Sequence, residues 1–208
     1  MQFSRLAAVI AAASALAVAG CGSTQATSPT TQSPAAQSPA SSQPAAQATH
    51  NDADITFAQQ MIPHHAQAIA MAEMATTHAA SPKVRELAAN IKQAQQPEID
   101  QMTGWLQAWG AQVPSTATSD MGGMGHGSGG SMPGMMSAEQ MNQMNQASGA
   151  QFDRMFLQMM IEHHTGAIEM AQTEVNDGEN SEAQQLAQKI IIDQQNEITE
   201  MQALLQEV

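Results

Sequence analysis

The sequence has a single cysteine and few basic residues. Cys21 is the only cysteine, which excludes an intramolecular disulfide and a thiolate metal cluster. Lysine and arginine total 6 against 19 aspartates and glutamates, for a formal net charge of -13. This excess of acid argues against a nucleic acid or an anionic membrane face as an electrostatic partner. A nucleophile elbow and a glycine-rich phosphate loop are also absent, so a hydrolytic or nucleophilic enzyme is unsupported. The charge balance suits a soluble protein that concentrates cations.

A repeated phrase organises what the sequence does contain. Residues 61–72 read Met-Ile-Pro-His-His-Ala-Gln-Ala-Ile-Ala-Met-Ala, and residues 160–171, 99 positions later, repeat this phrase with few changes. The same offset continues without a gap toward the end of the chain, where Leu87 pairs with Leu186. An ungapped repeat of this length indicates two copies of one structural unit.

The first 50 residues predict export and a tether. Residues 1–20 are typical of a signal peptide, because Arg5 gives a positive start and the apolar run that follows is too short to span a bilayer comfortably. Residues 18–21, Val-Ala-Gly-Cys, resemble the lipobox of bacterial lipoproteins. That resemblance implies a lipid on Cys21 that anchors the protein to the outer face of the cytoplasmic membrane or to another envelope membrane. Residues 21–50 are rich in Ser, Thr, Pro, Ala and Gln and predict a disordered tether.

Apolar residues at helical spacing predict two helical hairpins, residues 51–110 and 137–208. Neither hairpin can bury its apolar face alone, so we expect the two to pack together, or to swap between chains, as a four-helix bundle. Pro63 and Pro97 are expected to kink their helices, and a break is expected at Ser148-Gly149. The expected N-caps are Asn51, Ser81, Ser137 and Ser181.

Residues 111–136 form a linker rich in methionine, histidine and glycine. Its glycines disfavour a stable helix or strand, and its methionines are therefore not expected to fill a core. The linker is either a passive flexible connector or a mobile arm for Cu(I), since thioethers bind soft metals without losing a proton. The two candidate groups are Met121, Met124 and His126, and Met132, Met135 and Met136.

The polar residues that both repeats share are expected to gather at one height of the bundle. Folding the first hairpin near residue 80 brings its histidine pair level with Gln95 and Gln96 and places Glu98 one turn away. Folding the second near residue 179 brings His163 level with Gln195, with Gln194 and Glu197 beside it. A single histidine on a helix is more often structural than a ligand, but matched pairs flanked by thioethers favour copper, and Cu(I) in particular. The predicted ligands are His64, His65, His163, His164, Met61, Met71, Met160 and Met170, with Met121, Met124 and His126 in the linker. The residues expected to support them are Gln95, Glu98, Met102, Gln194, Glu197 and Met201.

The two phrases and the helices that follow them resemble a family of exported bacterial proteins called domain of unknown function 305. The shared motif is Met-Ile-x-His-His-x-x-Ala-Ile-x-Met-Ala, present twice and each time followed by Gln-Gln-x-Glu-Ile-x-x-Met. The resemblance covers about residues 51–208. It implies a ferritin-like fold and a role in copper binding or copper tolerance, with the motif histidines and methionines as the matching residues. Pro63 stands where the second repeat has Glu162, so the two halves can differ in binding.

Three functions are open at this point. The first is a lipid-anchored protein outside the cytoplasmic membrane that sequesters or delivers copper. The second is a ferritin-like di-iron oxidase, but such enzymes usually carry Glu-x-x-His on two helices, and the chain contains no such motif. The third is a helical interaction module, docked on an envelope protein or on a second copy of itself, whose histidines are structural. Our hypothesis is the first, a copper-binding protein that is not an enzyme and uses no organic cofactor.

Overall fold

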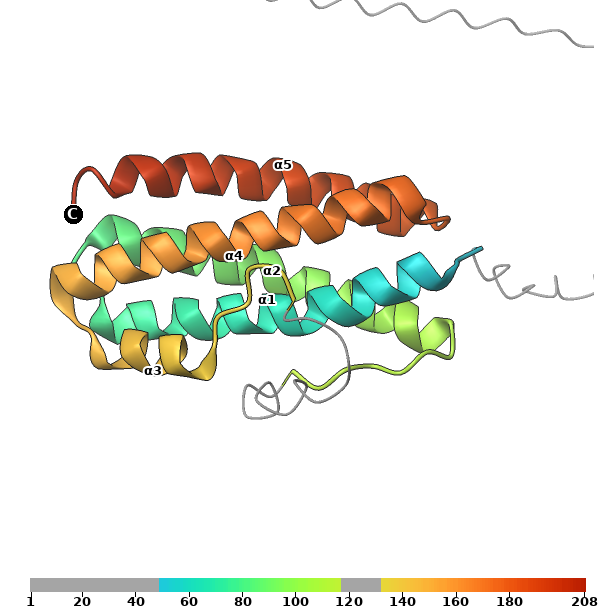
Figure 1. Ribbon diagram of the computed structural model, residues 1–208, viewed down its shortest axis with the longest axis horizontal. Helices are drawn as coiled ribbons and strands as arrows, with labels where there is room; N and C mark the ends of the chain where they lie inside the picture. Colours follow the sequence, from blue (N-terminus) through green and yellow to red (C-terminus); the bar gives the residue numbers. More distant parts are fainter. Residues whose placement is uncertain (1–48, 117–131) are drawn as a thin grey trace, which may run out of the picture. The chain divides into compact units, whose positions relative to one another are not determined.

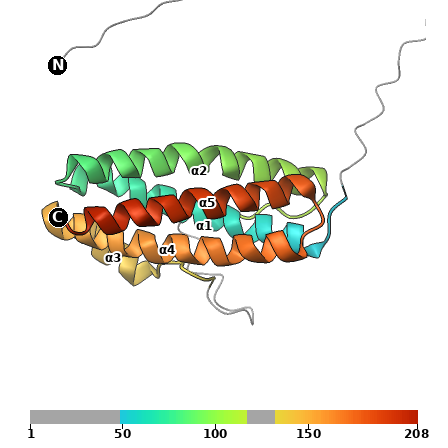
Figure 2. The same ribbon diagram turned by 90° about the horizontal axis from the view of Figure 1, so that it is seen from above.

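The computed structural model describes residues 49–116 and 132–208, in which all of the named secondary structure is helical (Figure 1). The helices are α1 (Asp52–His78), α2 (Pro82–Ala108), α3 (Ala138–Gln146), α4 (Gly149–Asp177) and α5 (Ser181–Leu204). The four long helices form two antiparallel hairpins, α1 with α2 and α4 with α5, which lie side by side through α1 and α4 (Figures 1 and 2). The predicted all-α class is confirmed, and α3 is a short addition before the second hairpin.

The helix ends follow the predicted caps with one exception. Asn51, Ser81 and Ser137 stand at the N-caps of α1, α2 and α3. The exception is Ser181, which is the first residue of α5, while Asn180 is the cap and its Oδ1 accepts from two backbone N–H groups of the first turn. The prediction for Ser181 is wrong by one residue because Asn and Ser are both strong capping types. The expected break before α4 is confirmed, since α4 begins at Gly149 with a φ of 65°.

Each hairpin turn is held by an aspartate of the other hairpin. The carboxylate of Asp54 on α1 accepts from the backbone N–H groups of Glu179 and Asn180, in the turn between α4 and α5. The equivalent Asp153 on α4 accepts from the backbone N–H groups of Ala80 and Ser81, in the turn between α1 and α2, at 3.1 and 2.9 Å. These exchanged contacts tie the two hairpins into one unit.

Two apolar clusters fill the bundle toward its opposite ends. One contains the buried apolar residues of α1 from Ala68 onward, with Phe152 and Phe156 of α4 and Met144 of α3. The other takes α1 up to Ala66 and packs it against the second half of α4 and the first half of α5. Four histidines lie between the clusters. Over the described ranges, none of the helices is long and apolar enough to cross a membrane.

Candidate metal centre

Four histidines meet at the middle of the bundle, where α1 lies along α4. His64, His65, His163 and His164 have no exposed surface. Because the two antiparallel helices carry the same motif, one histidine pair faces the other. The ring centroids of His64 and His163 are 3.7 Å apart, with an angle of 40° between the ring planes. The structure therefore brings together all four histidines that the sequence predicts as ligands.

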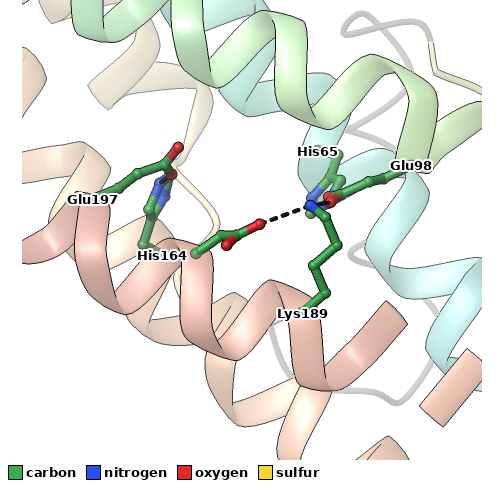
Figure 3. Close-up of polar contacts among 6 residues, drawn as sticks. His65, Glu98, His164, Lys189 and Glu197 are labelled. Carbon is green, nitrogen blue, oxygen red and sulfur yellow. Dashed lines mark hydrogen bonds and ion pairs between the residues drawn. The ribbon is translucent and has the colours of Figure 1, made fainter. Parts of the chain in front are cut away.

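One histidine of each pair, His65 or His164, is hydrogen-bonded to a glutamate on the next helix; we call these two the outer histidines, and His64 and His163 the inner ones. His65 Nε2 lies 2.9 Å from a carboxylate oxygen of Glu98 on α2, and His164 Nε2 lies 2.6 Å from one of Glu197 on α5 (Figure 3). Sequence reasoning placed glutamines level with the histidines, with Glu98 one turn away and Glu197 beside His163. The glutamates are instead the direct partners. Metal-bound histidines commonly donate their second ring nitrogen to a carboxylate in this way.

The remaining ring nitrogens have no hydrogen-bond partner. Within the part of the chain that the structure describes, this holds for Nδ1 of His64, His65 and His164 and for both ring nitrogens of His163. A neutral imidazole that donates through Nε2 keeps a lone pair on Nδ1. Each such lone pair is buried without a donor, which costs free energy unless a metal or another group uses it.

The inner histidines are held in their neutral form. Burial, with a smaller contribution from neighbouring His65, lowers the pKa of His64 to about 3. Burial and the other three histidines hold the pKa of His163 well below its usual value. At neutral pH neither ring carries a second proton, so a lone pair is free on each.

The predicted thioethers flank the histidines inside the two apolar clusters. Met71 and Met160 belong to one cluster, and Met61 and Met170 belong to the other. The supporting residues Met102, Met201, Gln95 and Gln194 are also buried. Neither polar atom of the Gln95 side-chain amide has a hydrogen-bond partner in the described ranges. Side chains with soft or neutral donor atoms are therefore buried in the clusters on either side of the histidines.

No three His, Cys, Asp or Glu side chains in residues 49–116 and 132–208 are arranged as a ready metal site. The imidazole lone pairs thus do not converge on one point. A metal ion held here would need thioether sulfur beside imidazole nitrogen, or a rotation of the rings.

A short segment, residues 132–136, closes over the histidines. The carbonyl of Pro133 accepts from His64 Nε2 at 3.0 Å. The side-chain amide of Gln67 donates to the carbonyl of Met136 and accepts from its N–H, at 2.9 and 2.7 Å. Met136 is 7% exposed and belongs to the first cluster, so the expectation that no linker methionine fills a core is wrong for this residue.

Two glycines allow this segment to approach α4. Gly134 has a φ of 74°, and a Cβ there would meet the carbonyls of Glu162 and His163. A Cβ on Gly166 would overlap the Pro133 carbonyl. The sequence did carry a signal for this contact, because Gly166 is the position in the second repeat that corresponds to Gln67. The two equivalent positions carry different residues, and both contact the segment of residues 132–136.

Several predicted residues lie outside the described ranges. These are Cys21, Met121, Met124 and His126.

Comparison with known proteins finds a family whose model covers both repeats. The model of the family described as "Domain of unknown function (DUF305)" matches residues 54–205. A DUF305 protein from Streptomyces coelicolor, described as secreted, is 35% identical, with a TM-score of 0.62 over 74% of this chain and 93% of that one. CopM in its Cu(II)-bound form is also 35% identical, with a TM-score of 0.62 over 74% of this chain and 96% of that one.

A viral relative matches a smaller part. The uncharacterized protein L153 of Acanthamoeba polyphaga mimivirus is 47% identical over 55 residues, which are 26% of this chain. The match spans 36% of that protein, about a third of its length.

Proposed function

The chain belongs to the DUF305 family, and we propose that this protein binds copper, with Cu(I) favoured, at the histidines and methionines in the middle of its bundle. The observation that carries the proposal is the set of buried imidazole nitrogens that have lone pairs and no hydrogen-bond donor. Imidazole nitrogen and thioether sulfur are the donor types that copper prefers when thiolate is absent. CopM, which is similar over most of its length, is known in Cu(II)-bound and Cu(I)-bound forms.

The role we propose is sequestration or delivery of copper, without catalytic turnover. The proposed ligands are His64, His65, His163, His164, Met61, Met71, Met160 and Met170. The His–Glu bonds support this role, because donation through Nε2 leaves Nδ1 free for a metal. Met121, Met124 and His126 are proposed as a further group of copper ligands. Through a lipid on Cys21, the protein would act on the outer face of the cytoplasmic membrane or at another envelope membrane.

A second candidate is an interaction module whose histidines are structural. The observation that favours it is that no three His, Cys, Asp or Glu side chains of the described ranges are arranged as a metal site. This candidate predicts that neither affinity for copper nor a change of stability with copper would be found.

The test is an anaerobic titration of the purified protein with Cu(I) against a competing chromophoric chelator. The first variant replaces His64, His65, His163 and His164 with alanine, and its matched control replaces His50 and His78, which lie away from the centre. A third variant, Met61→Leu with Met160→Leu, removes two thioethers at nearly constant volume, so it should stay folded. Circular dichroism checks that every variant is helical.

We expect the four-histidine variant to bind copper more than about 100-fold more weakly, beyond the loss typical of residues that only support ligands. The His50/His78 control should bind as the native protein does, and the leucine variant should bind more weakly than both. Tight binding by a folded four-histidine variant would move the site away from the bundle and make the histidines structural. Failure of the native protein to compete would overturn the copper proposal and favour the interaction module.

A further inference from the structure

A groove of about 450 Å³ lies between the first turns of α1 and the second half of α4. Its lining comes from these two helices and from Pro133 of the closing segment. The lining residues are Asp52, Ala53, Thr56, Phe57, Gln60, Pro133, Glu169, Met170, Thr173 and Glu174. The groove is therefore several times larger than the roughly 30 Å³ that one water molecule occupies in the liquid.

The repeat supplies a second, equivalent face, and that face is apolar and covered. The equivalents of Thr56, Gln60 and Thr173 are Met155, Met159 and Met74, at the offset of 99 residues. These three methionines pack against the first apolar cluster together with Met141 of α3. Helix α3 lies against α1 and α4 on this side (Figure 1). Two surfaces that the repeat makes equivalent have thus become different, one apolar and helix-covered and the other polar and hollow.

The hollow face has gained acids at the positions that differ. Asp52, Glu169 and Glu174 of the groove correspond to Gln151, Ala70 and Ala75 in the other repeat. No lysine, arginine or histidine lines the groove. A lining whose charged residues are all acidic attracts cations and raises their local concentration.

Glu174 is an acidic residue at a buried position, where a packed core normally has an apolar side chain. It is 1% exposed, and neither of its carboxyl oxygens has a hydrogen-bond partner within the described ranges. Burial and its neighbour Asp54, which accepts from backbone N–H groups, raise the pKa of Glu174 to about 8, so at neutral pH Glu174 is protonated and can donate to the Asp54 carboxylate. A buried carboxyl that keeps its proton because no positive charge is near it can exchange that proton for a cation.

Two residues that line the groove connect it with the histidine centre. Pro133, which lines it, is the residue whose carbonyl accepts from His64 Nε2. Met170, which also lines it, belongs to the same buried cluster as Met61, three residues before His64. One thioether of the proposed copper site is therefore within reach of an ion in the groove.

We infer that this groove is the route by which copper ions enter the bundle. Asp52 and Glu169 attract the cation to the mouth of the groove, and Met170 takes it toward the histidines. The inference rests on the proposed copper binding and adds where the ion is captured.

The test measures how fast the purified protein captures Cu(I). Protein and Cu(I) are mixed anaerobically in a stopped-flow instrument, and excess chromophoric chelator is added after a set delay to report copper not yet bound. The groove variant carries Asp52→Gln and Glu169→Ala, the residues of the other repeat at these positions. The control, Glu86→Gln with Glu200→Gln, removes the same charge from exposed residues outside the groove. A second pair compares Met170→Leu with its equivalent Met71→Leu.

We expect the groove variant to capture copper about tenfold more slowly than the control, with a weaker dependence of its rate on salt. Its equilibrium affinity should match that of the native protein. Met170→Leu should slow capture more than Met71→Leu. Equal rates for the groove variant and its control would overturn the inference and leave copper binding intact. Absence of copper binding by the native protein would instead overturn the proposed function.

Discussion

The two His–Glu pairs are equivalent in position but not in surroundings. Lys189 Nζ lies 2.9 Å from a carboxylate oxygen of Glu98, so Glu98 is shared between this ammonium group and His65 (Figure 3). The residue equivalent to Lys189 in the first repeat is Asn90, which is exposed and carries no charge. Burial raises the pKa of Glu98, but the bonds from His65 and Lys189 outweigh it and leave that pKa below its usual value. The ammonium group of Lys189 partly neutralises the Glu98 carboxylate, so Glu98 polarises His65 less than Glu197 polarises His164.

This inequality predicts unequal effects of removing the two carboxylates. Glu197→Gln should lower copper affinity more than Glu98→Gln, with losses in the range of about 10- to 100-fold typical of such supporting residues. Lys189→Asn should raise the affinity, because Glu98 then acts on His65 alone. Lys92→Asn, which removes a lysine paired with Glu73 on the surface, is the matched control. Competition titration with Cu(I) measures all four, and equal losses from the two glutamate variants would contradict the argument.

At the scale of elements, the segment over the histidines depends on one glycine in the middle of α4. Glycine inside a helix costs about 1 kcal/mol relative to alanine, so Gly166 is retained at a cost. What it permits is the approach of Pro133, whose carbonyl then reaches His64. Gln67 on α1 fixes the other end of the segment through Met136. The segment thus joins α1 and α4 across the metal centre.

Replacing this glycine should therefore distinguish the stability gained from docking of residues 132–136 from the stability lost through the low helix propensity of glycine. Gly166→Ala should destabilise the protein by up to about 2 kcal/mol, as the cost of overpacking less the gain in propensity. Gly104→Ala, in α2, should stabilise it by up to about 1 kcal/mol, since a Cβ there meets nothing within 4 Å. Urea unfolding measures both. Peroxide oxidation of Met136, followed by mass spectrometry, should accelerate only in Gly166→Ala, and unchanged oxidation would show that the segment stays docked.

At the scale of the whole molecule, the repeat carried most of what could be predicted. It indicated the two hairpins and the set of histidines and methionines that gather at mid-height, because apolar spacing and offset are local properties of the sequence. It did not indicate which helices of the two hairpins meet or which histidine of each pair is buried. The register of the two helices within each hairpin was harder to predict. A shift of one or two residues at a turn moves the facing residues by twice as much, which is why Gln95 was expected where Glu98 lies. The break in the repeat at Gln67 and Gly166 marks where the closing segment docks, but its path could not be predicted, since it depends on a positive φ at Gly134 and on contacts with residues far along the chain.

The stability of the metal-free protein should have a maximum in pH, and Glu174 sets its alkaline side. Burial and the neighbouring Asp54 carboxylate raise the pKa of Glu174 from 4.5 to about 8. Between these values the folded protein keeps a proton that the unfolded chain releases, so stability falls as pH rises, by up to about 1.4 kcal/mol per pH unit, and levels off above 8. His64 and His163 act in the opposite direction below 6.5, because the unfolded chain takes up two protons there that the folded protein does not bind; for His64 this holds down to about pH 3. Two histidine protons outweigh the single proton of Glu174, so stability rises with pH up to about 6.5.

The maximum is therefore expected near pH 6.5, the point where the histidine contribution ends and the glutamate contribution is left alone. Glu174→Gln keeps the size of the side chain but has no proton to release, so its stability should stay level between pH 6.5 and 8. The exposed substitution Glu86→Gln should keep the native slope. Urea unfolding at a series of pH values measures the three proteins. A native protein whose stability does not change over this window would mean that Glu174 ionises inside the fold, and that a cation or a donor group accompanies its carboxylate there.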